Sequence, residues 1–245
     1  MIERLLILFA LLCACGDDAR ASDASVDAGT EDVARIDVEQ SDSGTDIAFD
    51  RGGIFDPCPE KPMVDVVCGV DRNSRTGPGS ADTDYAATLS GCEEFVGNVD
   101  FRAGPDTNLE VMSSLRAVGQ LYVTGQSEVT SLAGAESLEW ASIEIRERPI
   151  TDLSPLSNLR NAESLLLEDL PLTSLDGLGR LECIGGLFLT NVPLDLDALT
   201  NLRVVGGVIQ IETEEEIDEE ALRAFIRRVR TSSLPVLVNG ESWAF

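Results

Sequence analysis

A repeat of 22 residues constrains the fold of this chain more than any other feature. Pairs of apolar residues separated by one residue recur six times, and each pair begins 22 residues after the previous one. This alternation is typical of a β-strand with one buried face. A small residue precedes most of the pairs by two positions. The six pairs are Val99/Phe101, Leu121/Val123, Ile143/Ile145, Leu165/Leu167, Leu187/Leu189 and Ile209/Ile211.

A second apolar set lies between the strands, at a spacing of three residues. This spacing suits a 3₁₀ or turn-rich segment better than a full α-helix. Clear examples are Leu153/Leu156/Leu159 and Leu175/Leu178/Leu181. The segments between the strands, which we call the returns, are too short to form the long crossover that a βαβ unit needs. We therefore predict a mainly β fold, a parallel β-solenoid over residues 92–212 whose coils stack about 4.8 Å apart.

Two families resemble this repeat. The segment Gly91-Cys92-Glu93-Glu94-Phe95-Val96-Gly97-Asn98-Val99 resembles the first coil of the receptor L-domain, and Ile150-Thr151-Asp152-Leu153-Ser154-Pro155-Leu156 is similar to the internalin type of leucine-rich repeat. Both resemblances imply a right-handed parallel solenoid that is used for recognition. The repeated asparagine after the strand survives only at Asn191, so we expect no asparagine ladder.

The receptor L-domain resemblance also implies how the cysteines are used. Residues 58–91 would form an N-terminal cap over the first coil. Cys92 would pair with Cys68, and Cys58 is the alternative partner. We expect Cys183, four residues before a strand, to pack as a small apolar side chain.

The first fifteen residues indicate export and lipid attachment. A short apolar run, Leu5–Leu12, follows Arg4 and falls well below the ~20 residues that span a membrane, which is typical of a signal peptide. The sequence Leu12-Cys13-Ala14-Cys15 resembles the bacterial lipobox. The resemblance implies that residues 1–14 are removed and that Cys15 carries the lipid. We therefore expect a lipoprotein of the bacterial cell envelope, held on the surface or periplasmic face of the outer membrane.

Residues 15–57 are expected to be a disordered acidic linker. Over residues 16–57 the sequence holds twelve acidic and three basic residues and shows no apolar periodicity. Such a segment cannot bury enough apolar surface to offset the entropy lost on ordering.

Residues 213–245 are expected to close the other end of the solenoid. Thr213-Glu214-Glu215-Glu216 has the pattern of a capping box, which predicts a helix from there to about Arg230. The arginines near the end of this helix match the helix dipole, although they are also a candidate ligand site. A final strand over residues 234–238 and a turn at Asn239-Gly240 are expected to follow.

Composition excludes several functions. The net charge of −26 disfavours nucleic acid as a partner. The absence of histidine removes the commonest general base and zinc ligand, and no phosphate-binding glycine loop is present. We expect a protein without cofactor, metal or catalytic residues. A remote enzymatic alternative is cleavage of polysaccharides by Asp100 and Glu144, which would lie about 9.6 Å apart on one face.

The residues between the members of each apolar pair are expected to point outward. Three of these positions, Tyr122, Leu166 and Phe188, carry apolar or aromatic side chains, which a sheet face exposed to water does not require. Such exposed side chains are typical of an interface. Arg102 and Arg146 follow on the same face and would add polar contacts. The sequence thus predicts a recognition module for a protein or glycan ligand. A structural envelope lipoprotein without a ligand is the alternative.

Overall fold

A computed structural model describes residues 58, 60–69, 72–80, 84–231 and 236–243. The chain divides into two units, Met1–Gly53 and Ile54–Phe245. The predicted signal peptide, the lipid attachment at Cys15 and the acidic linker over residues 15–57 all lie outside the described residues. No helix in the described ranges is long and apolar enough to cross a membrane.

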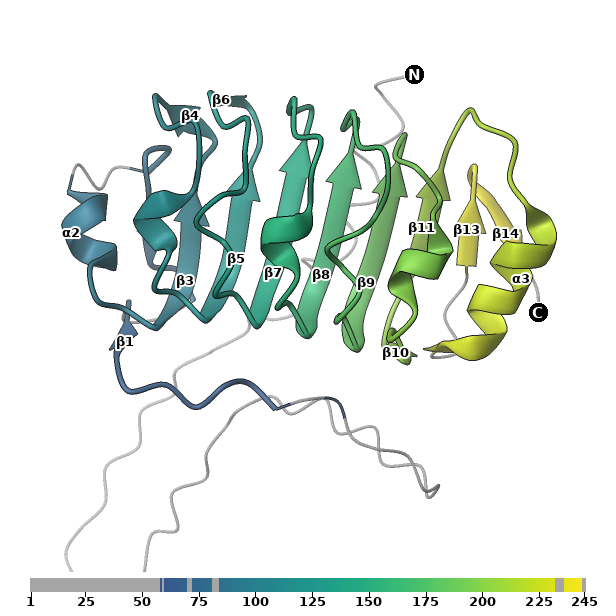
Figure 1. Cartoon of the computed structure of the whole chain (residues 1–245), viewed down its shortest axis with the longest axis horizontal. Coiled ribbons are helices and arrows are strands. Elements are labelled where there is room, and N and C mark those ends of the chain that lie inside the picture. The colour runs from purple at the N-terminus through teal and green to yellow at the C-terminus, as the bar shows by residue number, and fades with distance from the viewer. Residues whose placement is uncertain (1–57, 59, 70–71, 81–83, 232–235, 244–245) are drawn as a thin grey trace, which may run out of the picture. The chain divides into compact units, whose positions relative to one another are not determined.

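The described part is mainly β and is built on one largely parallel sheet of 12 strands (Figure 1). The main path through this sheet runs β1-β3-β5-β7-β8-β9-β11-β13-β14. Its strands are β1 (Val67–Cys68), β3 (Glu94–Asp100), β5 (Ala117–Val123), β7 (Trp140–Arg146), β8 (Asn161–Glu168), β9 (Cys183–Thr190), β11 (Ile209–Glu212), β13 (Val236–Val238) and β14 (Glu241–Trp243). Short strands β2 (Arg75–Thr76), β10 (Val204–Val205) and β12 (Arg230–Thr231) pair at its margins, and β4 (Ala103–Gly104) pairs with β6 (Gln126–Ser127).

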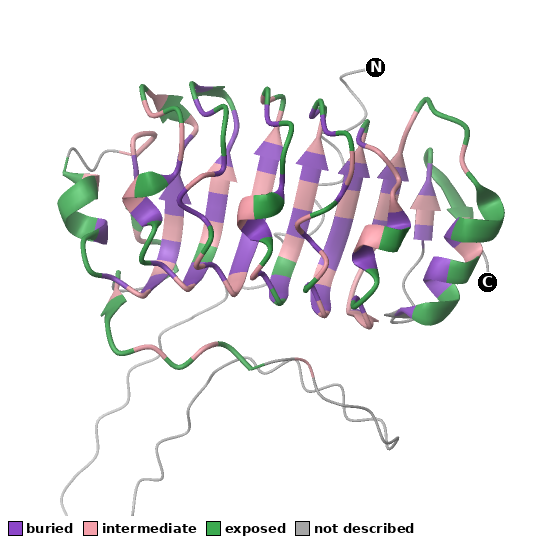
Figure 2. Cartoon of the chain, in the orientation of Figure 1, coloured by how far each residue is buried: buried purple, intermediate pink, exposed green. Residues whose placement is uncertain are grey.

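The 22-residue period sets the register of the central strands, as the sequence predicts. Val99 pairs with Leu121, which pairs with Ile143, and the row continues through the equivalent residue of each later strand. All members of the six apolar pairs are buried, at 0% exposure. Figure 2 shows the resulting alternation of buried and partly exposed positions along the central strands. The apolar period therefore fixes both the pairing and the core.

The return segments form the opposite wall of this core. They are short and contain the 3₁₀ turns η1 (Glu110–Met112), η2 (Ser154–Leu156) and η3 (Leu196–Leu199). Two returns lack such a helix and turn instead at Gly134 and Gly177, with φ of 103° and 102°. The leucines at spacing three are buried, so the prediction of a 3₁₀ or turn-rich return is confirmed.

Most of the small residues two positions before the apolar pairs lie within the strands and permit a close approach of neighbouring strands. A Cβ placed on Gly185 would lie 2.2 Å from the Glu163 carbonyl oxygen of the preceding strand. The strand register shifts in the same region, between Val118 and Gln120 in the pairing of β5 with β7. Glycine at these positions therefore lets adjacent backbones meet where the strands are irregular.

The N-terminal segment closes the first coil. Strands β1 and β2 both pair with β3, and a short helix, α2 (Tyr85–Leu89), follows. Cys68 is bonded to Cys92, with their Cα atoms 5.8 Å apart, as the resemblance to the receptor L-domain implied. The predicted main disulfide is therefore present.

The second disulfide was not predicted. Cys183 does not pack as a free apolar side chain: it is bonded to Cys58, 125 residues away in sequence, with a Cα–Cα distance of 5.7 Å. The segment from Cys58 to Val66, which we call the strap, runs from β1 along the edge where the strands begin (Figure 1). Two disulfides therefore pin this segment, at the first and the fifth of the central strands.

The C-terminal segment has a shorter helix than the capping box suggested. Helix α3 spans Glu219–Arg228, and its N-cap is Asp218, whose side chain accepts a hydrogen bond from Ala221 N at 3.0 Å. Thr213 instead accepts from Glu215 N within a turn, which places it outside the helix. Leu222 and Phe225 are buried, whereas Ala221 is exposed.

The last strands extend the sheet beyond α3. Strand β13 pairs in parallel with β11, and the turn at Asn239-Gly240 leads to the antiparallel β14. The expected final strand and turn are therefore present, and β14 is an addition that the sequence did not predict.

Candidate recognition surface

The outer row is the line of residues between the two members of each apolar pair. The sheet places these residues side by side on neighbouring strands, so that Leu166 lies beside Phe188 and Glu144 separates Leu166 from Tyr122. The full row is Asp100, Tyr122, Glu144, Leu166, Phe188 and Gln210. Five of its six members are partly exposed, so the predicted side-chain direction holds for most of the row.

Asp100 is the exception, because the N-terminal cap covers it. Its exposure is 0%, and Gly79 N donates to the Asp100 carbonyl oxygen at 2.8 Å. The side chain accepts hydrogen bonds from Arg102 Nε at 3.0 Å and from the Arg102 backbone N–H at 3.0 Å. The expected solvent-facing pair of carboxylates, Asp100 and Glu144, is therefore not formed.

The two predicted arginines are already paired with acids of this face. Arg102 binds Asp100 and places its guanidinium 4.9 Å from the centre of the Tyr122 ring. Arg146 lies 2.9 Å from Glu144 and 2.8 Å from Glu168. These arginines order the charged half of the outer face, over strands β3 to β8, and hold Tyr122 and Glu144 in fixed positions.

The apolar half of the outer face centres on Leu166 and Phe188. A Cβ placed on Gly186 would lie 2.7 Å from Phe188 Cε2, so the ring reaches back over a position that has no side chain. Both Leu166 and Phe188 are partly exposed. Adjacent apolar side chains that remain accessible on a sheet are typical of a contact surface.

Glu168 is a group of this face whose carboxyl pKa is shifted. Burial raises the pKa of the Glu168 carboxyl above its ordinary value, and the favourable charge of Arg146 only partly opposes this. The side chain of Glu168 is 17% exposed. The charge of the outer face at Glu168 is therefore lost at a higher pH than that of an ordinary glutamate.

A second feature, which the sequence reasoning missed, lies at the edge where the strands begin. The residue immediately before each strand alternates in charge along the sheet. The row is Glu93, Arg116, Glu139, Arg160, Glu182 and Arg203. The spacing of these residues varies between 21 and 23, which hides them from a search at a fixed period. Reading the position before each expected strand would have found them.

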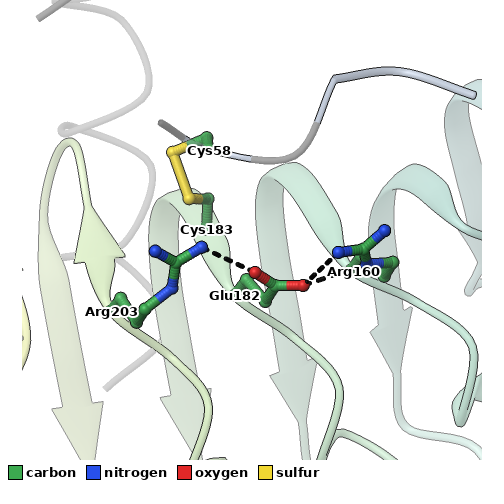
Figure 3. Close-up of a disulfide and its surroundings, with 5 residues drawn as sticks. All are labelled: Cys58, Arg160, Glu182, Cys183 and Arg203. Carbon is green, nitrogen blue, oxygen red and sulfur yellow. Dashed lines mark hydrogen bonds and ion pairs between the residues drawn. A yellow bond between two sulfur atoms is a disulfide. The ribbon is translucent and has the colours of Figure 1, made fainter. Parts of the chain in front are cut away.

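Five of the six members of this edge row form ion pairs with one another, between neighbouring repeats. Arg116 lies 2.7 Å from Glu139, while Arg160 and Arg203 both bind Glu182 at 2.6 Å (Figure 3). Burial pushes the pKa of Glu182 upward, but the hydrogen bonds from the two arginines outweigh it and hold the pKa below its ordinary value.

Five members of the edge row, Arg116, Glu139, Arg160, Glu182 and Arg203, line an open groove of about 930 Å³. The return segments supply the rest of its lining: Glu136, Ser137, Asn158, Arg180, Thr200 and Asn201. Glu182 is followed directly by Cys183, so the disulfide to Cys58 lies beside the groove (Figure 3). Across the described ranges, no group of three or more potential metal-ligating side chains lies close together.

No protein-family model, curated protein or solved structure matches the chain. The interpretation of both surfaces therefore depends on the residues themselves.

Proposed function

We propose that this chain is a lipid-anchored recognition protein of a bacterial cell envelope. In this proposal residues 92–212 form a right-handed parallel β-solenoid, Cys15 carries the lipid, and the acidic linker over residues 15–57 separates the two. The outer row is the ligand-binding face, and the ligand is a protein or a glycan. No catalytic step is assigned.

The observation that carries the proposal is the pairing of Leu166 with Phe188 on the outer face. Their strands are adjacent and in register, and both side chains remain partly exposed although the core lies on the other side of the sheet. A row that only faced water would have no need of these side chains. Tyr122, held by Arg102, adds an aromatic contact with a polar hydroxyl in the charged half.

A binding measurement on the double variant Tyr122→Ser, Phe188→Ser tests the proposal. The full chain with Cys15→Ser, added to envelope preparations of the source bacterium, should bind at least tenfold more strongly than the same chain carrying the double variant, since each lost aromatic anchor costs about 1–2 kcal/mol or more. Thr151→Ala, Ser157→Ala on the return side is the matched control and should bind normally. Equal binding by the double variant, with an unchanged melting temperature, would place the ligand site elsewhere.

The anchoring part of the proposal has its own test. Cys15→Ser should move the mature protein from the membrane fraction to the soluble fraction, because the export signal remains but the lipidated thiol is lost. Retention of this variant in the membrane fraction, after washing with salt, would contradict lipid attachment at Cys15.

A structural role without a ligand is the second candidate, and the strap favours it. Two disulfides across one edge suit a domain that bears load. Tight association with peptidoglycan that is insensitive to Tyr122→Ser, Phe188→Ser would support this alternative over recognition.

A further inference from the structure

The edge groove concentrates positive charge in a strongly acidic protein. Three guanidinium groups, those of Arg160, Arg180 and Arg203, line one half of it, and two of them, those of Arg160 and Arg203, bind the carboxylate of Glu182. Arg180 donates to Asn158 Oδ1 at 2.9 Å and forms no ion pair with any acid of the described residues. The residues that line the groove therefore carry one net positive charge, from four arginines against three glutamates, although the whole chain carries −26.

The other two acids of the groove are bound to partners other than Arg180. Glu139 is paired with Arg116 at 2.7 Å, in the other half of the groove. Glu136 turns its carboxylate to the backbone of its own turn, where it accepts from Gly134 N at 2.8 Å. The guanidinium of Arg180 is thus left facing the open groove.

The side chains around these arginines indicate what kind of anion fits. Every residue that lines the groove is polar or charged, so the groove offers no apolar anchor of the kind that peptide ligands use. Amides are already held in place on the rim, where Asn158 Nδ2 donates to Glu136 O at 2.7 Å and Asn201 Nδ2 donates to Gly179 O. Guanidinium forks bind planar carboxylates in two-point contacts, and the amide oxygens accept from hydroxyl groups.

We propose that the edge groove binds an acidic glycan, with a uronic acid carboxylate held by Arg160, Arg180 and Arg203. Glu182 positions Arg160 and Arg203, and the disulfide from the adjacent Cys183 to Cys58 fixes the backbone beneath them (Figure 3). The sugar hydroxyls contact Asn158, Asn201 and Thr200. This site is separate from the outer row, and the assignment does not depend on the function proposed above.

Titration of the full chain with a trimer of galacturonic acid tests the proposal. At about 0.15 M salt, where charges more than ~8 Å away are largely screened, the wild-type chain should bind the trimer. Arg180→Gln should weaken binding about tenfold, because one charge-assisted contact is lost. The galactose trimer, which has no carboxylates, should not bind. Arg148→Gln, at the opposite end of a strand, is the control and should bind like the wild type.

The alternative outcomes are distinct. Absence of binding by the wild type, or binding that Arg180→Gln leaves unchanged, would overturn the proposal. Binding of inorganic sulfate without binding of the trimer would overturn the assignment to a glycan. Phe188→Ser should leave trimer binding intact, so a failure here is distinguishable from a failure of the outer-row proposal. A melting curve for each variant confirms that it is folded.

Discussion

Glu147, Asp169 and Asn191 occupy the same corner of three successive coils, and each has a left-handed backbone, with φ of 51°, 51° and 48°. The preceding coil uses Gly125 there, with φ of 66°. The sequence predicted no asparagine ladder. A single rung does persist, in which Asn191 Nδ2 donates to Asp169 Oδ1 at 2.6 Å. The left-handed backbone is thus kept at this corner even where the residue is not asparagine.

Glu147 is the member of this set least suited to the left-handed backbone, because asparagine and aspartate adopt that backbone more readily. The left-handed conformation costs a non-glycine residue about 1 kcal/mol. Glu147→Gly should therefore raise the free energy of unfolding by up to about 1 kcal/mol in urea denaturation. Glu163→Gly, on the exposed side of strand β8, is the control and should lower it by about 0.5–1 kcal/mol. A destabilised Glu147→Gly variant would show that the Glu147 side chain contributes more than the strain removes.

Glu168 gives the outer face a measurable pH dependence. Because burial raises the pKa of Glu168 in the folded protein, ionisation of this group disfavours folding. Its contribution to stability is therefore complete below the pKa of the unfolded chain and declines as pH rises through the folded pKa. The free energy of unfolding, compared between the wild type and Glu168→Gln from pH 3 to pH 7, should show the difference shifting in favour of the variant as pH rises.

Asp152 should give the opposite dependence of stability on pH within the same protein. Hydrogen bonds from the Ser154 hydroxyl and backbone lower the pKa of Asp152. Its contribution is present above the unfolded pKa and is lost as pH falls through the folded pKa. Asp152→Asn should therefore lose stability relative to the wild type as pH rises. The same direction of change for both variants would contradict one of the two assignments.

The strands and returns that follow the 22-residue period could be predicted from the sequence. The elements whose bounds depend on a choice between several nearby residues could not. The strands and returns follow from Val99, Leu121 and their equivalents, because one apolar residue in register fixes the whole coil. The start of α3 was misjudged because the acidic segment before it offers several capping residues, and only Asp218 meets the helix. The burial of Asp100 depended on the path of the cap, which has no repeat to indicate it.

Substitutions at Asp218 and Thr213 test where helix α3 begins. Asp218→Ala should lower the free energy of unfolding by about 1 kcal/mol, because the hydrogen bond to Ala221 N and the favourable interaction with the helix dipole are both lost. Thr213→Ala is the control and should change stability by much less, since Thr213 lies in a turn outside the helix. A larger effect at Thr213 would restore the earlier helix start that the capping-box pattern suggested.

At the scale of the whole domain, the strap links strands that lie far apart in the sheet, because Met63 accepts from Arg116 beside β5 and Cys58 is bonded to Cys183 in β9. From Met63, whose carbonyl oxygen accepts from Arg116, to Cys58 is five residues, and these cross three strand spacings, or about 14 Å. This arrangement could not be predicted from sequence, because the partner of Cys58 depends on where a segment outside the repeat crosses the edge.

The strap should make the coils unfold together. Repeat domains lose cooperativity when distant coils are not coupled. The double variant Cys58→Ser, Cys183→Ser should lower the free energy of unfolding by about 2–4 kcal/mol, because the unfolded chain gains conformational entropy without this crosslink. Hydrogen exchange should show β11 and β13 losing protection before β3 and β5. Unchanged protection across all four strands would contradict a bracing role for this disulfide.

The most direct test of the recognition proposal is photocrosslinking from the outer row in living cells. A benzoyl-phenylalanine placed at position 188 of the full chain lies on the face that we assign to the ligand. The same residue at position 157 lies on the exposed return side. The account predicts a discrete adduct of defined mass from position 188 and none from position 157. An adduct from position 157 alone, or from neither position while the protein is folded and lipid-anchored, would contradict it.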